Sequence, residues 1–480
     1  MITGTQEQEN IWNAIAETDN HIFVNAGAGT GKTFTIVEAA NRLPFGNTAA
    51  FLAFNKSIAT ELANRLPSDV EAKTFHAFGF AAIRQAGIKT RMSGFKVNNI
   101  IKELLGKDFH VAPLKKLIGL IKGSLTEGTD KHAIMDLISE YNINFQSDRE
   151  LAIALEAIPA ILTMCRTQTH HIDFDDMIWL PLVNNYPMPN YDVMFVDEAQ
   201  DFNEAQRELI RKCVKGGRCI IVGDKNQAIY GFRGADSNSI GMFYQSLEGE
   251  EREISEFPLS ITWRCPTSVV KEANRFVKEF NAHKDAIAGT VIENAPFNPQ
   301  TNDMVLCRYN APLISAFYDL ISQGKNAYIL GRDMTQGLIM AVDKITKNDN
   351  MGTDEFWELF TTDFEFNFNK LIKQDKKAQA LALEDKKDCI EIFVHKATTV
   401  GGIKYEIKRV FDNADDGEIM LSTVHKAKGL EADNVYILAT DRMPHPLGGQ
   451  EENNIAYVAI TRAKKNLFYV GPKPELNWGD

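Results

Sequence analysis

Residues 21–41, HIFVNAGAGTGKTFTIVEAAN, carry the strongest indication of the fold class. An apolar run at residues 21–24 leads into a glycine-rich loop, and residues 32–41 then have the pattern of a helix. The backbone N–H groups of such a loop, together with the helix N-terminus, can bind a triphosphate. Glycine is required because only a residue without a side chain lets the backbone come that close to the phosphates. The pattern predicts the opening unit of a nucleotide-binding α/β domain.

The loop matches the phosphate-binding pattern GxxxxGK[ST], except that Ala26 occupies its first position. We expect Lys32 to reach the β- and γ-phosphates and the Thr33 hydroxyl to bind Mg²⁺. A loop of this spacing without a function is improbable, because the strand before it and the helix after it are both present. The expected nucleotide site comprises Ala26, Gly27, Ala28, Gly29, Thr30, Gly31, Lys32, Thr33 and Phe34.

A second element of this chemistry is FVDEAQD, residues 195–201, where two carboxylates follow an apolar strand. In this arrangement Asp197 binds the metal ion and Glu198 acts as the base that activates water. An acidic surface cluster is the alternative, but its pairing with a phosphate loop disfavours it. Together the two elements predict hydrolysis of a nucleoside triphosphate, and they leave open what the energy drives.

Length and composition restrict the class of protein. A chain of 480 residues suggests about three domains, and 44% hydrophobic with 24% charged residues excludes disordered and collagen-like classes. No apolar run approaches the ~18 residues that span a bilayer, and the N-terminus lacks the features of a signal peptide. We therefore expect a cytoplasmic protein without a membrane partner. The six cysteines have no metal-binding spacing, so buried thiols are expected.

Charge is unevenly distributed along the chain. The net charge is −12, yet residues 84–131 contain ten Lys or Arg against four Asp or Glu. Net charge governs solubility and does not exclude a local basic groove. A solvated helical face is the plain interpretation. The alternative is a phosphate-backbone contact through Lys115, Lys116 and Lys122.

Short apolar segments elsewhere predict the strands of two sheets. In the first half they lie at residues 49–54, 193–196 and 219–222, and in the second half at 304–307, 327–330, 419–423, 435–438 and 467–470. Residues 85–165 are mostly helical and basic. Residues 335–415 contain a helical run and a β-like piece at 389–394. The sequence predicts an α/β fold with two nucleotide-binding-type domains, each interrupted by an inserted helical or mixed subdomain.

Further motifs resemble those of the UvrD/Rep-type superfamily 1 DNA helicases, in order from Thr5 to Val470. The segments are TQEQENI (5–11), FLAFNK (51–56), KTFHAF (73–78), DFDDM (173–177), VGDKNQAIYGFRGA (222–235), TWRCPT (262–267), STVHKAKGLE (422–431) and AYVAITRAK (456–464). The resemblance implies two RecA-like P-loop motor domains. The implied segments are 1–84 and 171–258 for motor 1A, 85–170 for insertion 1B, 259–334 and 416–480 for motor 2A, and 335–415 for a short insertion 2B.

The resemblance also assigns roles at the nucleotide. Gln8 would read the adenine, with Gln6 as the fallback, and Trp263 stands where a tyrosine usually stacks on the base. Gln227 would sense the γ-phosphate. Charge grows on the phosphoryl oxygens during transfer, and the resemblance makes Arg264 and Arg462 arginine fingers that stabilise it. Glu431 would link the nucleotide to the DNA-contacting motif.

A groove that tracks single-stranded DNA needs phosphate ligands and aromatic faces for stacking bases. The expected DNA contacts, all but Arg308 within the matched motifs, are Phe54, Asn55, Lys56, His76, Tyr230, Phe232, Arg308, Thr423 and His425. Outside such motifs an aromatic residue or a histidine belongs more often to the core. Two departures from the family are expected to matter: Phe34 replaces a usual arginine at the nucleotide, and Phe232 replaces a usual tryptophan that would stack on a DNA base.

The sequence thus predicts an enzyme that uses ATP and Mg²⁺, moves 3′ to 5′ on single-stranded DNA and unwinds duplex. The direction rests on the resemblance alone. Expected partners are single-stranded DNA and its junctions with duplex, together with proteins of replication, repair or recombination. The alternative is a DNA-dependent ATPase that strips proteins from DNA or acts as a switch without processive unwinding.

Overall fold

The computed structural model describes residues 4–44, 46–53, 56–141, 143, 145–214, 216–229, 239–247, 252–331, 333–374, 377–412, 417–445 and 449–474. The chain divides into two compact units. The first unit contains residues 1–27 and 31–260, and the second contains residues 261–480 together with Ala28–Thr30. Each unit is built around its own parallel sheet.

The first unit contains a six-stranded sheet in the order β3-β2-β6-β7-β1-β8. Its neighbouring strands all pair in parallel, with Phe51 beside Phe195 and Phe23 beside Ile221. Parallel strands are covered on both faces, which explains their nearly continuous apolar sequences. The strands are β1 (His21–Ala26), β2 (Ala49–Ala53), β3 (Val70–Thr74), β6 (Val193–Val196), β7 (Arg218–Gly223) and β8 (Ile254–Leu259).

Successive side chains of a strand point to opposite faces, so the sheet divides its apolar residues between two cores. Phe51 and Phe195 pack with Trp12, whereas Leu52 and Val196 pack with Phe202. Helices of the first core are α1 (Gln6–Glu17), α2 (Lys32–Asn41) and α3 (Lys56–Ala63). Helices of the second are α4 (Phe75–Gln85), α9 (Phe174–Val183), α10 (Glu204–Cys213) and α11 (Ser239–Leu247).

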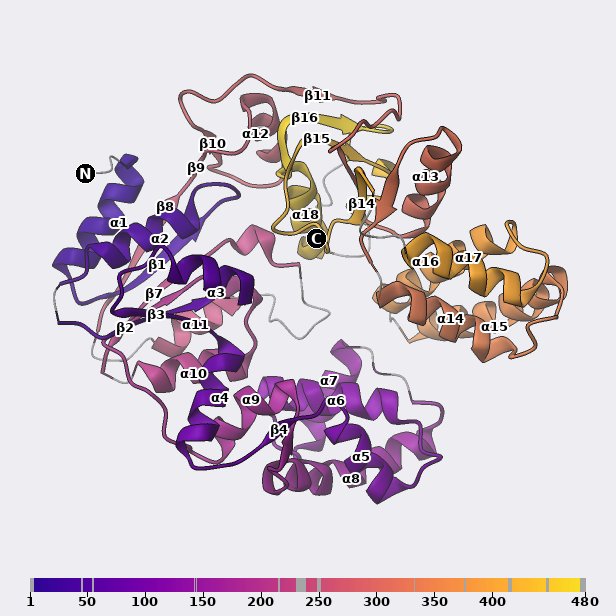
Figure 1. Ribbon diagram of the computed structural model, residues 1–480, viewed down its shortest axis with the longest axis horizontal. Helices are drawn as coiled ribbons and strands as arrows, with labels where there is room; N and C mark the ends of the chain where they lie inside the picture. The colour runs from indigo at the N-terminus through magenta and orange to yellow at the C-terminus, as the bar shows by residue number, and fades with distance from the viewer. Residues whose placement is uncertain are drawn as a thin grey trace. The chain divides into compact units, whose positions relative to one another are not determined.

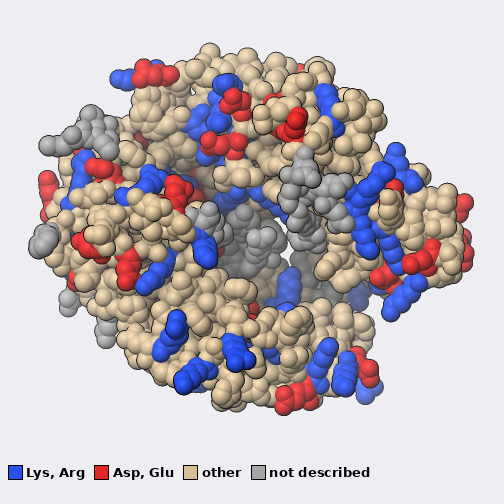
Figure 2. All heavy atoms as spheres, viewed as in Figure 1, with Lys and Arg blue, Asp and Glu red and all other residues tan. Residues whose placement is uncertain are grey.

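Between α4 and α9 the chain forms a cluster of helices, drawn in purple in Figure 1. It consists of α5 (Lys96–Leu105), α6 (Val111–Ser124), α7 (Lys131–Glu140) and α8 (Asp148–Thr167), with a short parallel pair β4 (Arg91–Met92) and β5 (His171–Ile172). Its core is continuous with α4 and α9 through Ile83 and Leu180. Figure 2 shows Lys and Arg side chains exposed over this cluster.

The second unit also contains a six-stranded parallel sheet, in the order β11-β16-β15-β12-β14-β13. The strands are β11 (Thr290–Ile292), β12 (Met304–Cys307), β13 (Ala327–Ile329), β14 (Ile419–Thr423), β15 (Ala432–Ile437) and β16 (Ala463–Tyr469). Helices α12 (Thr267–Ala273), α13 (Ala311–Ser322) and α18 (Gly449–Ile460) belong to the same unit. Two parallel-sheet α/β domains confirm the predicted fold class.

Helices interrupt this second sheet between β13 and β14. They are α14 (Asp333–Ile345), α15 (Thr353–Lys373), α16 (Lys377–Val394) and α17 (Val400–Asp412), drawn in orange in Figure 1. The β-like piece predicted at residues 389–394 is wrong, because these residues end α16. Cys389, Ile390 and Phe393 are buried on one side of that helix. Their β-branched and aromatic character suggested a strand, but helical packing decides the outcome.

All six cysteines are buried and free, as expected. Within the part of the chain that the structure describes, no helix is long and apolar enough to cross a membrane.

Candidate nucleotide-binding site

The carboxyl edge of the first sheet gathers the predicted nucleotide residues. The phosphate loop follows β1, Asp197 and Glu198 follow β6, and Gln227 lies on η2 (Lys225–Gln227) after β7. Strand β7 pairs with both β1 and β6, so these three loops emerge side by side. Ligands of open parallel sheets bind at this edge.

Backbone conformation in the phosphate loop requires glycine at two positions. Gly29 has φ +66° and Gly31 has φ +80°, both in the left-handed region that residues with a Cβ rarely adopt. Gly31 is the N-cap of α2 and, as a glycine, has no side chain that could block an anion there. Lys32 therefore begins the helix at the end where backbone N–H groups are available for an anion.

Lys32 is paired with the predicted base. Its Nζ lies 3.5 Å from Oε1 of Glu198, and both side chains are partly buried. Glu198 adopts φ +56°, an uncommon backbone conformation for a residue with a side chain. Such strain is found preferentially at functional sites, where the surrounding structure holds it in place.

Thr33 and Asp197 fit a magnesium site. The Thr33 hydroxyl donates to Oδ2 of Asp197 at 3.2 Å, and Asp197 is 6% exposed. Burial, and then the neighbouring carboxylate of Glu198, raise the pKa of Asp197, while the Lys32 ammonium opposes them. A cation beside this carboxylate would offset the cost of burying its charge. Hydroxyl and carboxylate oxygens are also the ligands that Mg²⁺ prefers.

Two buried side chains that sequence reasoning missed connect Glu198 with Gln227. Gln200 donates from Nε2 to Oε2 of Glu198 at 2.5 Å, and its Oε1 accepts the backbone N–H of Asp224 at 3.0 Å. Asp224 in turn accepts a hydrogen bond from Nε2 of Gln227 at 2.7 Å. The only sequence signal for Gln200 was a polar residue one position beyond the alanine that follows the acidic pair.

The predicted adenine reader lies in the interior of the first unit. Gln8 is 2% exposed, its Nε2 donates to Oγ1 of Thr35 at 3.0 Å, and its Oε1 accepts the N–H of Thr5. Gln6, the fallback, is exposed on the same helix. Phe34 packs edge-on against Trp12, with ring centroids 6.2 Å apart. Which glutamine reads the base stays a prediction.

In the second unit, the structure brings Arg264 and Glu431 together. Nε of Arg264 lies 2.5 Å from Oε2 of Glu431, so the predicted finger and the predicted linking acid form an ion pair. Arg462 is 1% exposed, and its guanidinium donates to the carbonyls of Val458 and Leu430. The roles of both arginines at a phosphate stay predictions.

Trp263 is 54% exposed and lies against His283. The two rings are stacked, with centroids 3.7 Å apart and an angle of 24° between their planes. Strands β9 (Ile261–Thr262) and β10 (Asn281–Ala282) pair in parallel and bring the two residues together. One ring face is thus covered from within the unit. An exposed aromatic ring held in this way is suited to stacking against a base.

Among the predicted DNA contacts of the first unit, Lys56 and His76 follow neighbouring strands. Lys56 is exposed at the start of α3, and His76 is half-buried in the first turn of α4. His76 meets the exposed ring of Phe174 edge-on at 5.6 Å, and burial lowers its pKa. The predicted contacts Phe54, Asn55, Tyr230 and Phe232 lie outside the described residues.

In the second unit, Arg308, Thr423 and His425 lie at the carboxyl ends of β12 and β14, which pair with each other. Nε and Nη2 of Arg308 both lie 2.8 Å from Oε1 of Glu452. Thr423 is 8% exposed and His425 is half-buried. The ends of β12 and β14 place these three residues at the same edge of the second sheet. The ion pair with Glu452 restrains the Arg308 side chain.

The expected phosphate contact of Lys122 is wrong. Lys122 is fully buried, and its Nζ lies 2.8 Å from Oδ1 of Asp176 and 3.1 Å from Oδ2 of Asp173. Burial alone would lower the pKa of this ammonium, but the two carboxylates raise it above its ordinary value. The side chain follows Leu114 and Ile118 at intervals of one helical turn, which places it at the edge of the buried face. Lys115 and Lys116 are not buried in this way.

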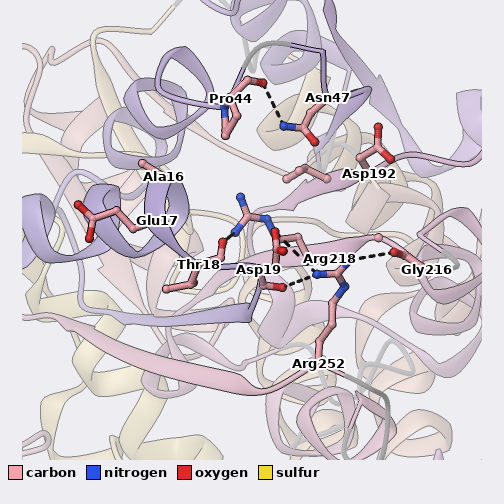
Figure 3. Close-up of a pocket in the computed structure, with 12 residues that line it drawn as sticks. Ala16, Glu17, Thr18, Asp19, Pro44, Asn47, Asp192, Gly216, Arg218 and Arg252 are labelled. Atoms are coloured by element: carbon pink, nitrogen blue, oxygen red, sulfur yellow. Dashed lines mark hydrogen bonds and ion pairs between the residues drawn. The ribbon is translucent and has the colours of Figure 1, made fainter.

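A polar pocket of about 210 Å³ lies at the opposite, amino-terminal edge of the first sheet, and Figure 3 shows its lining. Arg218 donates to the carbonyls of Thr18 and Ile15, and Arg252 donates to those of Asp19 and Gly216. The carbonyl end of a helix attracts cations. Arg218 therefore fixes the end of α1, Arg252 ties the turn after it to Gly216, and the pocket is separate from the phosphate loop.

A phosphate loop after β1, an acidic pair after β6 and a glutamine after β7 define a P-loop nucleotide-binding protein. Two family models identify the family. The model of the UvrD/REP helicase N-terminal domain matches residues 7–248, and that of the UvrD-like helicase C-terminal domain matches residues 365–471. The chain belongs to the UvrD/REP helicase family. This result confirms the resemblance found in the sequence.

Curated relatives agree with this assignment. F-box DNA helicase protein 1 of Schizosaccharomyces pombe is 26% identical, with 97% of this chain and 57% of that protein covered. F-box DNA helicase 1 of Gallus gallus is 24% identical, with coverages of 97% and 48%. ATP-dependent DNA helicase PcrA of Leuconostoc citreum is 25% identical, with coverages of 56% and 38%. The chain spans about half the length of the first two relatives.

Proposed function

We propose that this protein is an ATP-dependent DNA helicase that moves on single-stranded DNA and unwinds duplex. The observation that carries the proposal is the joint placement of Lys32, Thr33, Asp197 and Glu198 at one sheet edge, with Lys32 Nζ 3.5 Å from Glu198 and Thr33 Oγ1 3.2 Å from Asp197. A phosphate loop, a metal-binding pair and a base within reach of one another are the parts that phosphoryl transfer to water needs. The names of the curated relatives add the DNA substrate.

Each residue of the proposed nucleotide site has a separate role in ATP hydrolysis. Backbone N–H groups at the start of α2 and the Lys32 ammonium bind the phosphates, and Thr33 with Asp197 would hold Mg²⁺, which supplies positive charge to the phosphate oxygens when bound. Glu198 accepts a proton from the water that attacks the γ-phosphorus. Gln227 senses the γ-phosphate. Arg264 and Arg462 supply charge to the transferring group.

We retain the six-segment division of the chain as part of the proposal. The helices α5–α8 within residues 85–170, and α14–α17, which begin at Asp333 and end within the proposed segment 335–415, support two inserted subdomains, 1B and 2B. The proposed strand path uses Lys56, His76, Arg308, Thr423 and His425. Movement from 3′ to 5′, a role in replication, repair or recombination, and a cytoplasmic location complete the proposal and follow from the family alone.

The test is ATP hydrolysis with and without single-stranded DNA. The proposal predicts a turnover that needs Mg²⁺ and rises at least about 10-fold with saturating DNA. A turnover that is indifferent to DNA would contradict it. A protein that is stimulated by DNA but displaces no strand would instead be the protein-stripping ATPase or switch.

A further inference from the structure

Gln200, on η1 (Ala199–Asp201) directly after Glu198, connects two segments of the nucleotide site. The side chain is 2% exposed, and both ends of its amide are used. Nε2 donates to Oε2 of Glu198 at 2.5 Å, and Oε1 accepts the N–H of Asp224 at 3.0 Å. A carboxylate can only accept and a backbone N–H can only donate, so these partners fix the orientation of the amide.

The connection continues from Asp224 to Gln227. Asp224 is 1% exposed at the end of β7, and its Oδ2 accepts the Nε2 hydrogen of Gln227 at 2.7 Å. Its Oδ1 accepts the N–H of Asn226 at 3.0 Å, which holds the carboxylate in place. Breaking a buried hydrogen bond without a replacement costs free energy. We therefore expect Gln200, Asp224 and Gln227 to move together.

A glycine makes room for this arrangement. A Cβ added to Gly223 would lie 2.8 Å from Oε1 of Gln200 and 2.8 Å from Cδ1 of Ile240. These distances are too short for ordinary contacts, so an alanine there would displace the amide. The end of β7 is therefore shaped to admit the Gln200 side chain.

We propose that Gln200 is a positioning residue that aligns the Glu198 carboxylate and, through Asp224, couples it to Gln227. This inference rests on the proposed ATP hydrolysis. It adds that the position of the Glu198 carboxylate depends on the position of Gln227. When Gln227 meets a γ-phosphate, any shift of Asp224 is passed to the Gln200 amide and to the carboxylate it holds. The alignment of the base therefore responds to the contact between Gln227 and the γ-phosphate.

The test compares Gln200→Ala, Gln227→Ala and the double variant in steady-state ATP hydrolysis at saturating single-stranded DNA. We expect Gln200→Ala to lower kcat at least about 10-fold, because the base loses its alignment, and to leave KM within about 2-fold. The double variant should be no slower than the slower single variant, because residues that act as one unit are not additive. Gly223→Ala should reproduce the loss of kcat.

Gln206→Ala is the matched control. Gln206 accepts the N–H of Asn203 at 2.9 Å in the capping box of α10, away from the acidic pair, so its loss should leave kcat unchanged. Binding of a fluorescent ATP analogue to Gln200→Ala at wild-type affinity would show that the variant is folded.

A Gln200→Ala variant with kcat within about 2-fold of wild type, or a double variant whose loss equals the product of the single losses, would overturn the inference while leaving the proposed function intact. A wild-type protein without DNA-stimulated hydrolysis would overturn both.

Discussion

Nζ of Lys32 lies 3.5 Å from Oε1 of Glu198, so the phosphate-binding lysine and the proposed base share one partly buried space. The ammonium stabilises the carboxylate in its ionised form, which is the form that a base needs. A γ-phosphate entering this space would compete with Glu198 for Lys32. Glu198 therefore balances the charge of Lys32 before substrate arrives, whereas the buried carboxylate of Asp197 has room for a cation partner.

Glu198→Gln and Lys32→Ala should affect different steps. Glu198→Gln keeps the shape but removes the base, so we expect DNA-stimulated turnover to fall at least about 100-fold with ATP binding retained. Lys32→Ala removes a phosphate contact and should weaken binding as well. ATP hydrolysis and the affinity for a fluorescent ATP analogue separate the two results. Near-normal turnover in either variant would refute the site.

Nucleotide choice should be relaxed in this chain. Phe34, at the position where the family resemblance implies an arginine, lies against Trp12, and both ends of the Gln8 amide already have partners within the unit. We expect GTP and CTP to be used to a measurable extent, as judged by kcat/KM for the four nucleotides. Gln6→Ala and Gln8→Ala form a matched pair that shows which side chain reads the base. Discrimination for ATP above ~10³, about 4 kcal/mol, would contradict this expectation.

Two lysines on α6 should behave differently. Lys122→Gln leaves the buried Asp176 without one of its ammonium partners, at 2.8 Å in the wild type, and should cost about 3 to 5 kcal/mol in the free energy of unfolding. Lys115 lies on the surface, so Lys115→Gln should change the free energy of unfolding by less than about 0.5 kcal/mol. The same variant should bind DNA with an affinity that depends less on salt. Urea unfolding and binding at several salt concentrations test the pair. Equal stabilities of the two variants would contradict the assignment of a buried network.

Acid should destabilise the first sheet through His21. Burial, and then the charges of Arg252 and Arg218, lower the pKa of His21 to about 4 from an ordinary value of 6.5. The folded state thus binds this proton less readily than the unfolded state. The contribution of neutral His21 to the free energy of unfolding is therefore complete above about pH 6.5. It is lost as the pH falls towards 4, by at most about 3 kcal/mol. His21→Asn should flatten this part of the curve of unfolding free energy against pH. An unchanged slope would assign the acid sensitivity to carboxylates.

The buried parallel strands could be predicted from sequence because their apolar runs are continuous. Residues 193–196, 304–307 and 419–423 are strands with the predicted bounds. Strands β3 and β8 were missed because they lie at the sheet edges, where Glu71, Lys73 and Pro258 interrupt the apolar pattern. Edge strands are half exposed and tolerate such residues.

Motif spacing identified the residues of the proposed nucleotide site but not the side chains that hold them in position. Lys32, Asp197 and Gln227 were found because the motifs name them. Gln200 and Asp224 are joined by a hydrogen bond between segments 24 positions apart, a relationship that no local pattern contains. Lys122 was misplaced because a run of lysines was read as one surface, although helical periodicity turns one of them inward.

We propose that ATP hydrolysis at the first sheet drives movement along DNA, and a strand-displacement assay measures this coupling. Duplexes with a 3′ tail or a 5′ tail are mixed with wild-type protein or Glu198→Gln, in the presence of Mg²⁺ and ATP. We predict that the wild type displaces the strand from the 3′-tailed duplex and that Glu198→Gln binds the same DNA without displacing it. Displacement that survives in Glu198→Gln, or that occurs in the wild type without ATP, would contradict the account.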